Sequence, residues 1–175
     1  DLIILPGSKL VMKDLTWLKR VGLLEQIQEY KKNVLCICGG YEMMFKKLHD
    51  PYCLENETSI SMDGFNEIDD EIIFEKEKIL KKGEYTLFGI KMKGFEIHHG
   101  SSSVYPLYYE NKLLQGTFVH GILDNDEFRT KYLQKINSSY EGFSFSEYKR
   151  RTINTFVNEM KNNLDVEFIK KCITK

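Results

Sequence analysis

The sequence has few of the residues that mark linkers, membrane spans and secreted scaffolds. Its 175 residues include three prolines and one tryptophan, and no apolar run approaches the roughly 20 residues that a membrane-spanning helix needs. Three prolines exclude a proline-rich linker, and a hydrophobic share of 42% excludes a disordered chain. No basic, apolar-cored leader stands at the N-terminus, so we expect a soluble protein that is not secreted.

Charge and cysteine content narrow the class further. The chain carries 25 basic and 26 acidic residues, a net charge of −1 that gives no reason to expect nucleic acid or a membrane as partner. The cysteines are too sparse for a disulfide framework, which favours a reducing, cytoplasmic compartment. No histidine has zinc-type spacing to a cysteine, so we expect no metal site. The cysteines are Cys36, Cys38, Cys53 and Cys172.

The first 50 residues alternate between buried strands and helices. Residues 2–5 form a continuous apolar run closed by Pro6-Gly7-Ser8, and residues 34–38 form a second run closed by Gly39-Gly40. Such runs are typical of parallel strands that are buried on both faces. Helical spacing is expected at 14–20, 24–32 and 41–48. This order of strand, turn and helix predicts an α/β fold.

After residue 50 the predicted pattern changes from alternating strands and helices to a series of strands, but no domain boundary is apparent. Glycines separate several short predicted strands, and helical periodicity then returns for the remainder of the sequence. We therefore interpret residues 1–175 as one domain with terminal helices from about residue 146. The strands are expected at 72–74, 85–92, 95–97, 104–109 and 113–119, and the helices at 124–136, 148–164 and 165–173.

Cys38 is the candidate nucleophile. It ends an apolar strand and is followed at once by Gly39-Gly40 and a predicted helix, the order of an elbow that exposes a nucleophile on a strained turn. The start of a helix favours the thiolate, and the N–H of Gly39 would point toward an oxyanion. The alternative is a buried structural cysteine beside glycines needed for packing, because Cys36 occupies the usual first small position of the elbow.

His120 is the candidate base. It follows the apolar residues 117–119, so it lies at a strand end, where an α/β sheet presents its site. A thiol nucleophile needs an imidazole to take its proton and later to protonate the leaving amine. His98 and His99 compete for this role, and spacing alone does not choose between the three. Pro6-Gly7-Ser8 offers either a second oxyanion donor or only a turn.

Taken in chain order, these pieces resemble the class I, triad-type glutamine amidotransferase domain at the C-terminus of cobyric acid synthases. The resemblance covers essentially the whole chain, including its terminal helices. The segments that carry it are Asp1-Leu-Ile-Ile-Leu-Pro-Gly-Ser-Lys9, Asp14-Leu-Thr-Trp-Leu18, Cys36-Ile-Cys-Gly-Gly-Tyr41, Asp50-Pro51 with Glu55, Gly94-Phe-Glu-Ile-His98 with Gly100, and Gly116-Thr-Phe-Val-His-Gly-Ile122 with Phe128-Arg129.

The resemblance implies a reaction and a site. Cys38 would attack the side-chain amide of L-glutamine to give a glutamyl thioester and ammonia, and water would then release glutamate. His120 would act as base and then acid, with Gly7 and Gly39 as the oxyanion hole. Further residues are implied as substrate contacts or as residues that orient a histidine. They are Ser8, Tyr41 and Glu42 for the substrate, and Glu96 and His98 for orientation.

The resemblance also implies a fold and a partner. We expect a flavodoxin-like, doubly wound domain with a mainly parallel sheet, lacking the first strand of the family domain. In the family an ATP-dependent synthetase domain on the same chain uses the ammonia to amidate adenosylcobyrinic acid a,c-diamide to cobyric acid. The resemblance implies that ATP and magnesium bind to that domain. This sequence has no Gly-x4-Gly-Lys-Ser/Thr phosphate loop, so we expect it to bind no nucleotide and to need no cofactor of its own.

Departures from the family pattern keep two alternatives open. The family elbow usually has glycine where Cys36 stands and glutamine where Glu42 stands, and Arg-Thr after Gly100 is replaced by Ser101-Ser102. A carboxylate near the thiol would raise the thiol pKa. One alternative is the glutaminase of a related amidotransferase, either the peptidoglycan-amidating one or cobyrinate a,c-diamide synthase. The other is a degenerate domain that only binds a partner.

Overall fold

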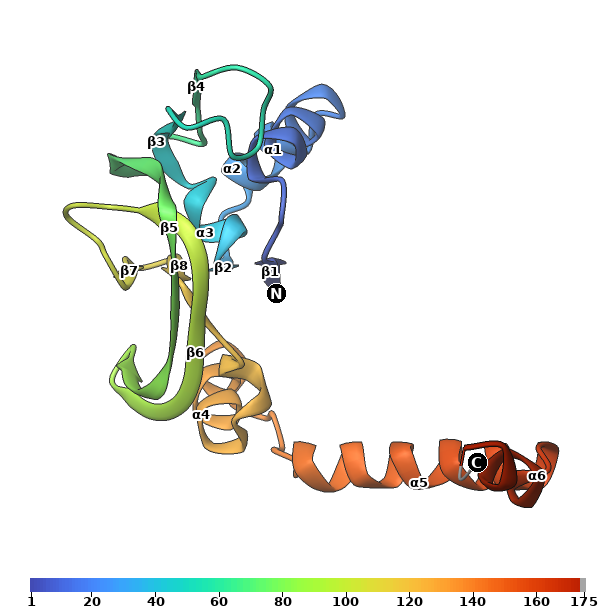
Figure 1. Cartoon of the computed structure of the whole chain (residues 1–175). Coiled ribbons are helices and arrows are strands. Elements are labelled where there is room, and N and C mark those ends of the chain that lie inside the picture. Colours follow the sequence, from blue (N-terminus) through green and yellow to red (C-terminus); the bar gives the residue numbers. More distant parts are fainter. Residues whose placement is uncertain (174–175) are drawn as a thin grey trace.

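A computed structural model describes residues 1–173, and its first sheet has the parallel core that the sequence predicts. The sheet has the order β1-β2-β8-β7 (Figure 1). Its strands β1, β2 and β8 run parallel, and β7 is antiparallel to β8. All three parallel strands therefore end at the same edge of the sheet. The bounds are β1 (Leu2–Leu5), β2 (Asn33–Ile37), β7 (Tyr108–Glu110) and β8 (Leu114–Thr117).

Helices cover both faces of this sheet, as in a doubly wound fold. Alternate residues of β2 point to opposite faces: Val34 and Cys36 join one apolar cluster, and Leu35 joins another. Helices α1 (Val11–Arg20) and α2 (Leu23–Glu29) contribute to the first cluster, and α4 (Asp126–Ile136) contributes to the second. The α/β, flavodoxin-like fold class expected from the sequence is confirmed.

A second sheet stands beside the first and is mostly antiparallel. Its order is β4-β3-β5-β6-β9, and only β3 and β5 run parallel. Strands β5 and β6 form a long hairpin whose turn at Phe88-Gly89 has φ values of 52° and 76°, as a tight hairpin turn requires. The bounds are β3 (Phe45–Asp50), β4 (Ile60–Asp63), β5 (Ile68–Leu87), β6 (Ile90–Ser101) and β9 (Val119–His120).

The prediction of a helix at 41–48 is wrong for most of these residues. Helix α3 (Gly39–Glu42) is a single turn, after which the chain enters strand β3. Phe45 and Leu48 are completely buried, and β3 pairs with β4 on one side and β5 on the other. Pairing with strands that are distant in sequence outweighs the local helical pattern. A one-turn helix also gives Cys38 less support from a helix dipole than the sequence suggested.

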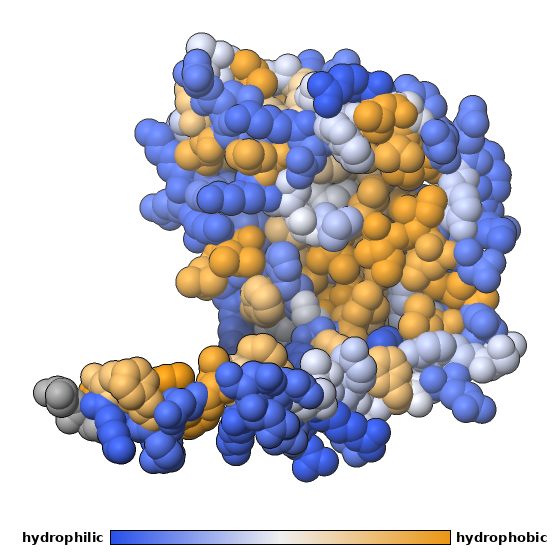
Figure 2. All heavy atoms as spheres, turned by 90° about the vertical axis from the view of Figure 1, so that its right-hand side faces the viewer, coloured by the Kyte–Doolittle hydropathy of each residue, from blue (hydrophilic) through white to orange (hydrophobic). Residues whose placement is uncertain are grey.

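The last two helices of the described residues project away from the two sheets and their covering helices, which we call the body. After the short turn η1 (Ile122–Asp124) and α4, helices α5 (Phe145–Asn163) and α6 (Val166–Ile173) form a C-terminal arm (Figure 1). They match the helices expected at 148–164 and 165–173. Neither has a buried residue, and Figure 2 shows apolar side chains along the arm's upper edge. Within residues 1–173, no helix has both the length and the apolar character to cross a membrane.

Candidate active site

Cys38 lies at a strained turn between β2 and α3. Its φ of 51° and ψ of −112° are unusual for a residue with a side chain. The two glycines that follow allow the elbow to sit directly on the loop after β1. A Cβ on Gly40 would lie 2.3 Å from the Leu5 carbonyl oxygen, and one on Gly39 would lie 2.6 Å from the Ser8 nitrogen. Close backbone packing therefore explains the glycine pair.

His120 lies beside Cys38 but comes from the other sheet. It ends β9, which pairs with β6, and its ring stacks on Phe95 with centroids 5.1 Å apart. A Cβ on Gly7 would lie 3.2 Å from His120 Cε1 and 3.6 Å from Cys38 Cβ. The imidazole, the thiol-bearing carbon and the loop after β1 thus border one small space. His120 Nε2 is buried and, within residues 1–173, has no hydrogen-bond partner.

Burial favours the uncharged form of both of these side chains in the resting site. Burial, with a smaller contribution from Glu42, raises the pKa of Cys38 to about 12, although the Gly39 N–H works in the opposite direction. Burial, followed by His98, lowers the pKa of His120. At neutral pH the resting site therefore holds a thiol beside a neutral imidazole. A neutral imidazole is the form that can accept a proton.

Glu42 is buried beneath the elbow. Its side chain is 2% exposed, and Oε1 lies close enough to Gly100 that a Cβ there would be 2.2 Å away. Burial, then the charge of Glu55, raises the pKa of Glu42 to about 8, and the Gly100 N–H partly offsets this. The carboxyl is therefore mostly protonated at neutral pH, and its charge opposes the Cys38 thiolate mainly above about pH 8.

Ser8 and Tyr41, which were also predicted to contact the substrate, make hydrogen bonds to other groups of the protein. Ser8 Oγ donates to Asp14 Oδ2 at 2.5 Å and accepts from the Leu10 N–H at 3.0 Å, so it fixes the turn into α1. Tyr41 is completely buried, and its hydroxyl donates to the Tyr105 carbonyl at 3.2 Å. Both side chains shape the elbow and its support. Their contact with glutamine stays a prediction.

Glu96 and His98 interact with each other rather than with His120. Glu96 Oε2 lies 3.5 Å from His98 Nε2, and His98 Nδ1 lies 2.7 Å from the Gly100 carbonyl oxygen. The His98 ring stacks on Phe118 at 3.9 Å. Neither residue makes a hydrogen bond to His120 in the described part of the chain, so any influence on the base acts through charge and packing.

Asp50 and Glu55 support the site in a way that the residue pattern alone did not indicate. The Asp50 carboxylate accepts backbone N–H bonds from Leu54, Glu55 and Asn56. Glu55 in turn accepts the N–H groups of Val11 at 2.9 Å and Met12 at 2.8 Å, which begin helix α1. This connection fixes the segment just after Pro6-Gly7-Ser8. The shared Asp50-Pro51 and Glu55 positions were the only signal for it.

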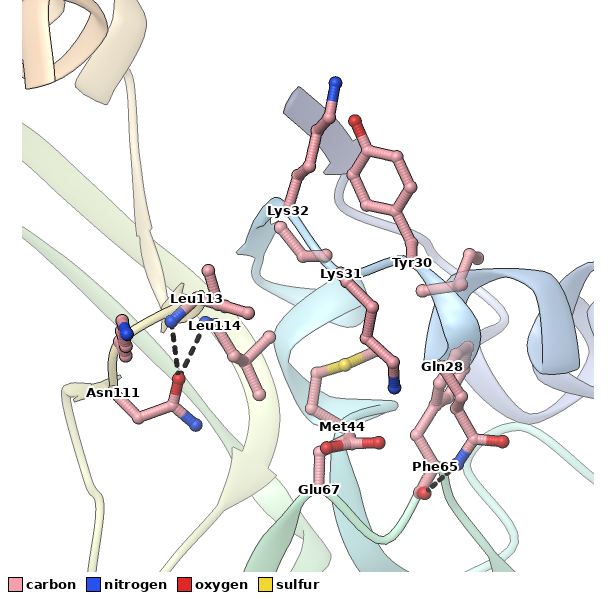
Figure 3. A pocket seen from close by; sticks show the side chains of 13 residues that line it. Gln28, Tyr30, Lys31, Lys32, Met44, Phe65, Glu67, Asn111, Leu113 and Leu114 are labelled. Atoms are coloured by element: carbon pink, nitrogen blue, oxygen red, sulfur yellow. Dashed lines mark hydrogen bonds between the residues drawn. The ribbon is translucent and has the colours of Figure 1, made fainter. Parts of the chain in front are cut away.

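Two pockets lie at different ends of the first sheet. One of about 280 Å³ borders the elbow and is lined by Gly7, Gly40 and Trp17 among others. The other, of about 370 Å³, is lined by Val34 and Leu114, the first apolar residues of β2 and β8 (Figure 3). The second pocket is thus at the opposite strand ends from Cys38. Among residues 1–173, no group of three or more His, Cys, Asp or Glu is placed to hold a metal ion.

The fold and the elbow define the class of enzyme. A cysteine on a strained turn at the carboxyl end of a parallel strand, with a histidine bordering the same space, is the arrangement of a nucleophile elbow in α/β enzymes. The chain belongs to the family of CobB/CobQ-like glutamine amidotransferase domains, whose family model matches residues 1–108.

Curated relatives extend the similarity to nearly the whole chain. The cobyric acid synthase of Acinetobacter baylyi is 50% identical over 173 residues, which cover 99% of this chain and 37% of that protein. The cobyric acid synthase of Clostridium tetani is 30% identical over 201 aligned residues, covering 99% of this chain and 41% of that protein. The adenosylcobalamin biosynthesis bifunctional protein CobDQ of Leptospira interrogans is 38% identical over 157 residues, covering 78% and 18%. The chain therefore spans about two fifths of the length of the cobyric acid synthases it matches.

Proposed function

We propose that this chain hydrolyses glutamine to glutamate and ammonia, with Cys38 as nucleophile and His120 as base. The observation that carries the proposal is the shared space at Gly7, which both Cys38 Cβ and His120 Cε1 border. The Nε2 of His120 supports it, because this buried nitrogen has no hydrogen-bond partner within residues 1–173 and such unsatisfied groups are rare in native proteins.

The proposed reaction has two halves. Cys38 Sγ attacks the amide carbon of glutamine while its proton passes to His120, and the N–H groups of Gly7 and Gly39 stabilise the oxyanion. The C–N bond then breaks, His120 returns the proton to the leaving nitrogen, and ammonia departs from a glutamyl thioester. Water attacks the thioester with His120 again accepting a proton, and glutamate leaves as the thiol is restored.

We further propose that the ammonia serves cobalamin biosynthesis in the cytoplasm. The similarity to two cobyric acid synthases supports this destination. An ATP-dependent synthetase domain on the longer polypeptide would use the ammonia to amidate adenosylcobyrinic acid a,c-diamide, and ATP and magnesium would bind there. The acceptor would thus be chosen outside residues 1–175.

One observation favours a second function, a domain that binds its partner without catalysis. The buried acid Glu42 stands where the related family sequences usually carry glutamine, and its charge helps to raise the thiol pKa. If Glu42 were ionised during turnover, the thiolate would be disfavoured. The two functions differ in whether Cys38 reacts with a glutamine-like electrophile.

Labelling with 6-diazo-5-oxonorleucine, a glutamine-like electrophile, tests the proposal. We expect one label, mapped to Cys38, that Cys38→Ser abolishes and His120→Asn slows at least 10-fold. The exposed thiol of Cys53 is a built-in control, because it should react with iodoacetamide but not with the glutamine analogue. Absence of any label at Cys38, in this chain and in the full-length protein with ATP, would favour the non-catalytic function.

A further inference from the structure

The pocket at the first residues of β2 and β8 is separate from the elbow (Figure 3). It shares no lining residue with the pocket that borders Gly7 and Gly40. Its volume of about 370 Å³ lies within the roughly 300–1,000 Å³ that is typical of small-molecule sites. We call it the distal pocket, and its lining includes Lys31, Glu67 and Leu114.

The floor of the distal pocket is apolar and belongs to the core. The residues that form it are at most 7% exposed, and they are Val34, Met44, Phe65 and Leu114. Because these side chains are packed from behind, they present a fixed apolar surface. Val34 and Leu114 belong to the first sheet, whereas Met44 directly precedes β3 and Phe65 lies between β4 and β5. A ligand in the pocket therefore contacts the first sheet and segments that lead into the second.

Side-chain hydrogen bonds hold the walls of the distal pocket in place (Figure 3). Gln28 Nε2 donates to the Phe65 carbonyl at 2.7 Å, which joins the end of α2 to the loop before β5. On the other wall, Asn111 Oδ1 accepts the N–H groups of Leu113 at 2.9 Å and Leu114 at 2.7 Å, which closes the turn between β7 and β8. The pocket is therefore largely formed without a ligand, and this lowers the entropy cost of binding.

Two opposite charges line the distal pocket without pairing with each other. In Figure 3 the Lys31 side chain extends past Met44 toward the end of the pocket where the Glu67 carboxylate lies. In the part of the chain that the structure describes, neither Lys31 nor Glu67 has a side-chain hydrogen bond or an ion pair. Lys32 points away from the pocket and pairs with Asp1 at 3.0 Å. The pocket thus offers an ammonium group and a carboxylate above an apolar floor.

We propose that the distal pocket binds a free amino acid that has an apolar side chain. The carboxylate of the ligand pairs with Lys31, its ammonium group pairs with Glu67, and its side chain covers Met44 and Leu114. A simple anion would face the Glu67 carboxylate, and a simple cation would face Lys31 and Lys112, whereas a zwitterion matches both signs. The inference does not depend on glutamine chemistry, because the pocket lies at the strand ends opposite the elbow.

Photolabelling of the full-length protein with L-photo-leucine, a leucine analogue that carries a diazirine, tests the proposal. We expect the label on residues that line the distal pocket, mainly near Met44 and Leu114. L-leucine should compete at least 10-fold more strongly than 4-methylpentanoate, which lacks the ammonium group, isopentylamine, which lacks the carboxylate, or L-glutamine, which has a polar side chain. Absence of label from the pocket, or competition by any of these three compounds that equals that of L-leucine, would overturn the proposal.

Charge variants test the two ion pairs separately. Lys31→Gln and Glu67→Gln should each raise the L-photo-leucine concentration for half-maximal labelling at least 10-fold, because each leaves one charge of the ligand unpaired. Lys32→Gln is the matched control and should change it less than 2-fold, since the Lys32 ammonium points away from the pocket. All three side chains are exposed, so folding should not change. Equal labelling of the three variants would contradict the proposal, and Cys38→Ser should label like the parent, which separates this test from that of the glutaminase.

Discussion

At the scale of single residues, the site depends on how burial sets the charge of three neighbours. Burial keeps the Cys38 thiol protonated, the His120 imidazole neutral and the Glu42 carboxyl mostly protonated near pH 7. The resting site therefore carries little charge, and charge would appear only when the thiol proton moves to His120. A developing charge in a dry site depends strongly on the N–H groups around it.

Glu42→Gln should stabilise the protein increasingly as pH rises. The folded pKa of Glu42 is about 8 against an ordinary value of 4.5, so the folded state holds a proton that the unfolded state releases in this range. Parent stability thus falls as pH rises from 4.5 toward 8 because of this group, and glutamine removes that dependence. We expect a gain on the order of 1–4 kcal/mol at pH 8 and little difference at pH 5, measured by urea unfolding.

Glu57→Gln is the matched control for this prediction. Glu57 is exposed, so its replacement should change stability equally little at both pH values. A Glu42→Gln gain that is the same at pH 5 and pH 8 would contradict the raised pKa. The same variant should also speed alkylation of Cys38 above pH 8, where the parent carboxylate is ionised and opposes the thiolate.

At the scale of elements, the elbow and the loop after β1 form one packed unit. Gly40→Ala should be severely destabilising, by about 3 kcal/mol or more, because its Cβ would lie 2.3 Å from the Leu5 carbonyl oxygen. Gly83→Ala in β5 meets nothing within 4 Å and should change stability by less than about 0.5 kcal/mol. Denaturant unfolding of both variants gives the comparison, and similar losses in both would refute the close approach.

The elements also show how far the sequence could predict the structure. The runs at 2–5 and 34–38 became β1 and β2, because short continuous apolar runs closed by glycine-containing turns leave a strong local signal for strands. The helix expected at 41–48 became β3 after one turn, because its partners β4 and β5 lie far along the chain. Local periodicity does not contain such partners.

The site could be predicted in part for the same reason. The turn geometry at Cys38 follows from neighbouring residues, and its positive φ agrees with the elbow. The choice of His120 over His98 was not accessible from spacing, because it depends on which ring reaches Gly7 after two sheets have packed. The Asp50 and Glu55 connection to α1 joins segments 40 or more residues apart, so only the family pattern hinted at it.

At the scale of the whole molecule, the body and the arm should differ in their contribution to stability. α5 buries no residue, so a chain that ends at Lys149 should melt within about 2 °C of the 175-residue chain. Its helical circular-dichroism signal should nevertheless fall, because most of α5 and all of α6 are gone. Thermal unfolding followed by near-ultraviolet circular dichroism measures the body alone.

A chain that ends at Gly142 is the informative comparison. It also lacks Phe143 and Phe145, and with them the Arg129 contact to the Phe143 carbonyl and the Asp126 contact to the Phe145 N–H. This chain should melt several degrees lower, since a buried guanidinium loses partners. A large loss of stability already in the chain ending at Lys149 would show that the arm supports the body.

Cys38 and His120 come from different sheets, so the distance between their side chains depends on how the two sheets pack against each other. Cys38 follows β2 of the first sheet, whereas His120 ends β9 of the second, and the chain crosses from β8 to β9 at the single residue Phe118. A slide of one sheet past the other by about 1 Å would misplace sulfur and nitrogen and cost roughly 100-fold in rate. Under the proposed mechanism, the rate of glutamine hydrolysis would therefore depend on the relative position of the two sheets as well as on the residues of the site.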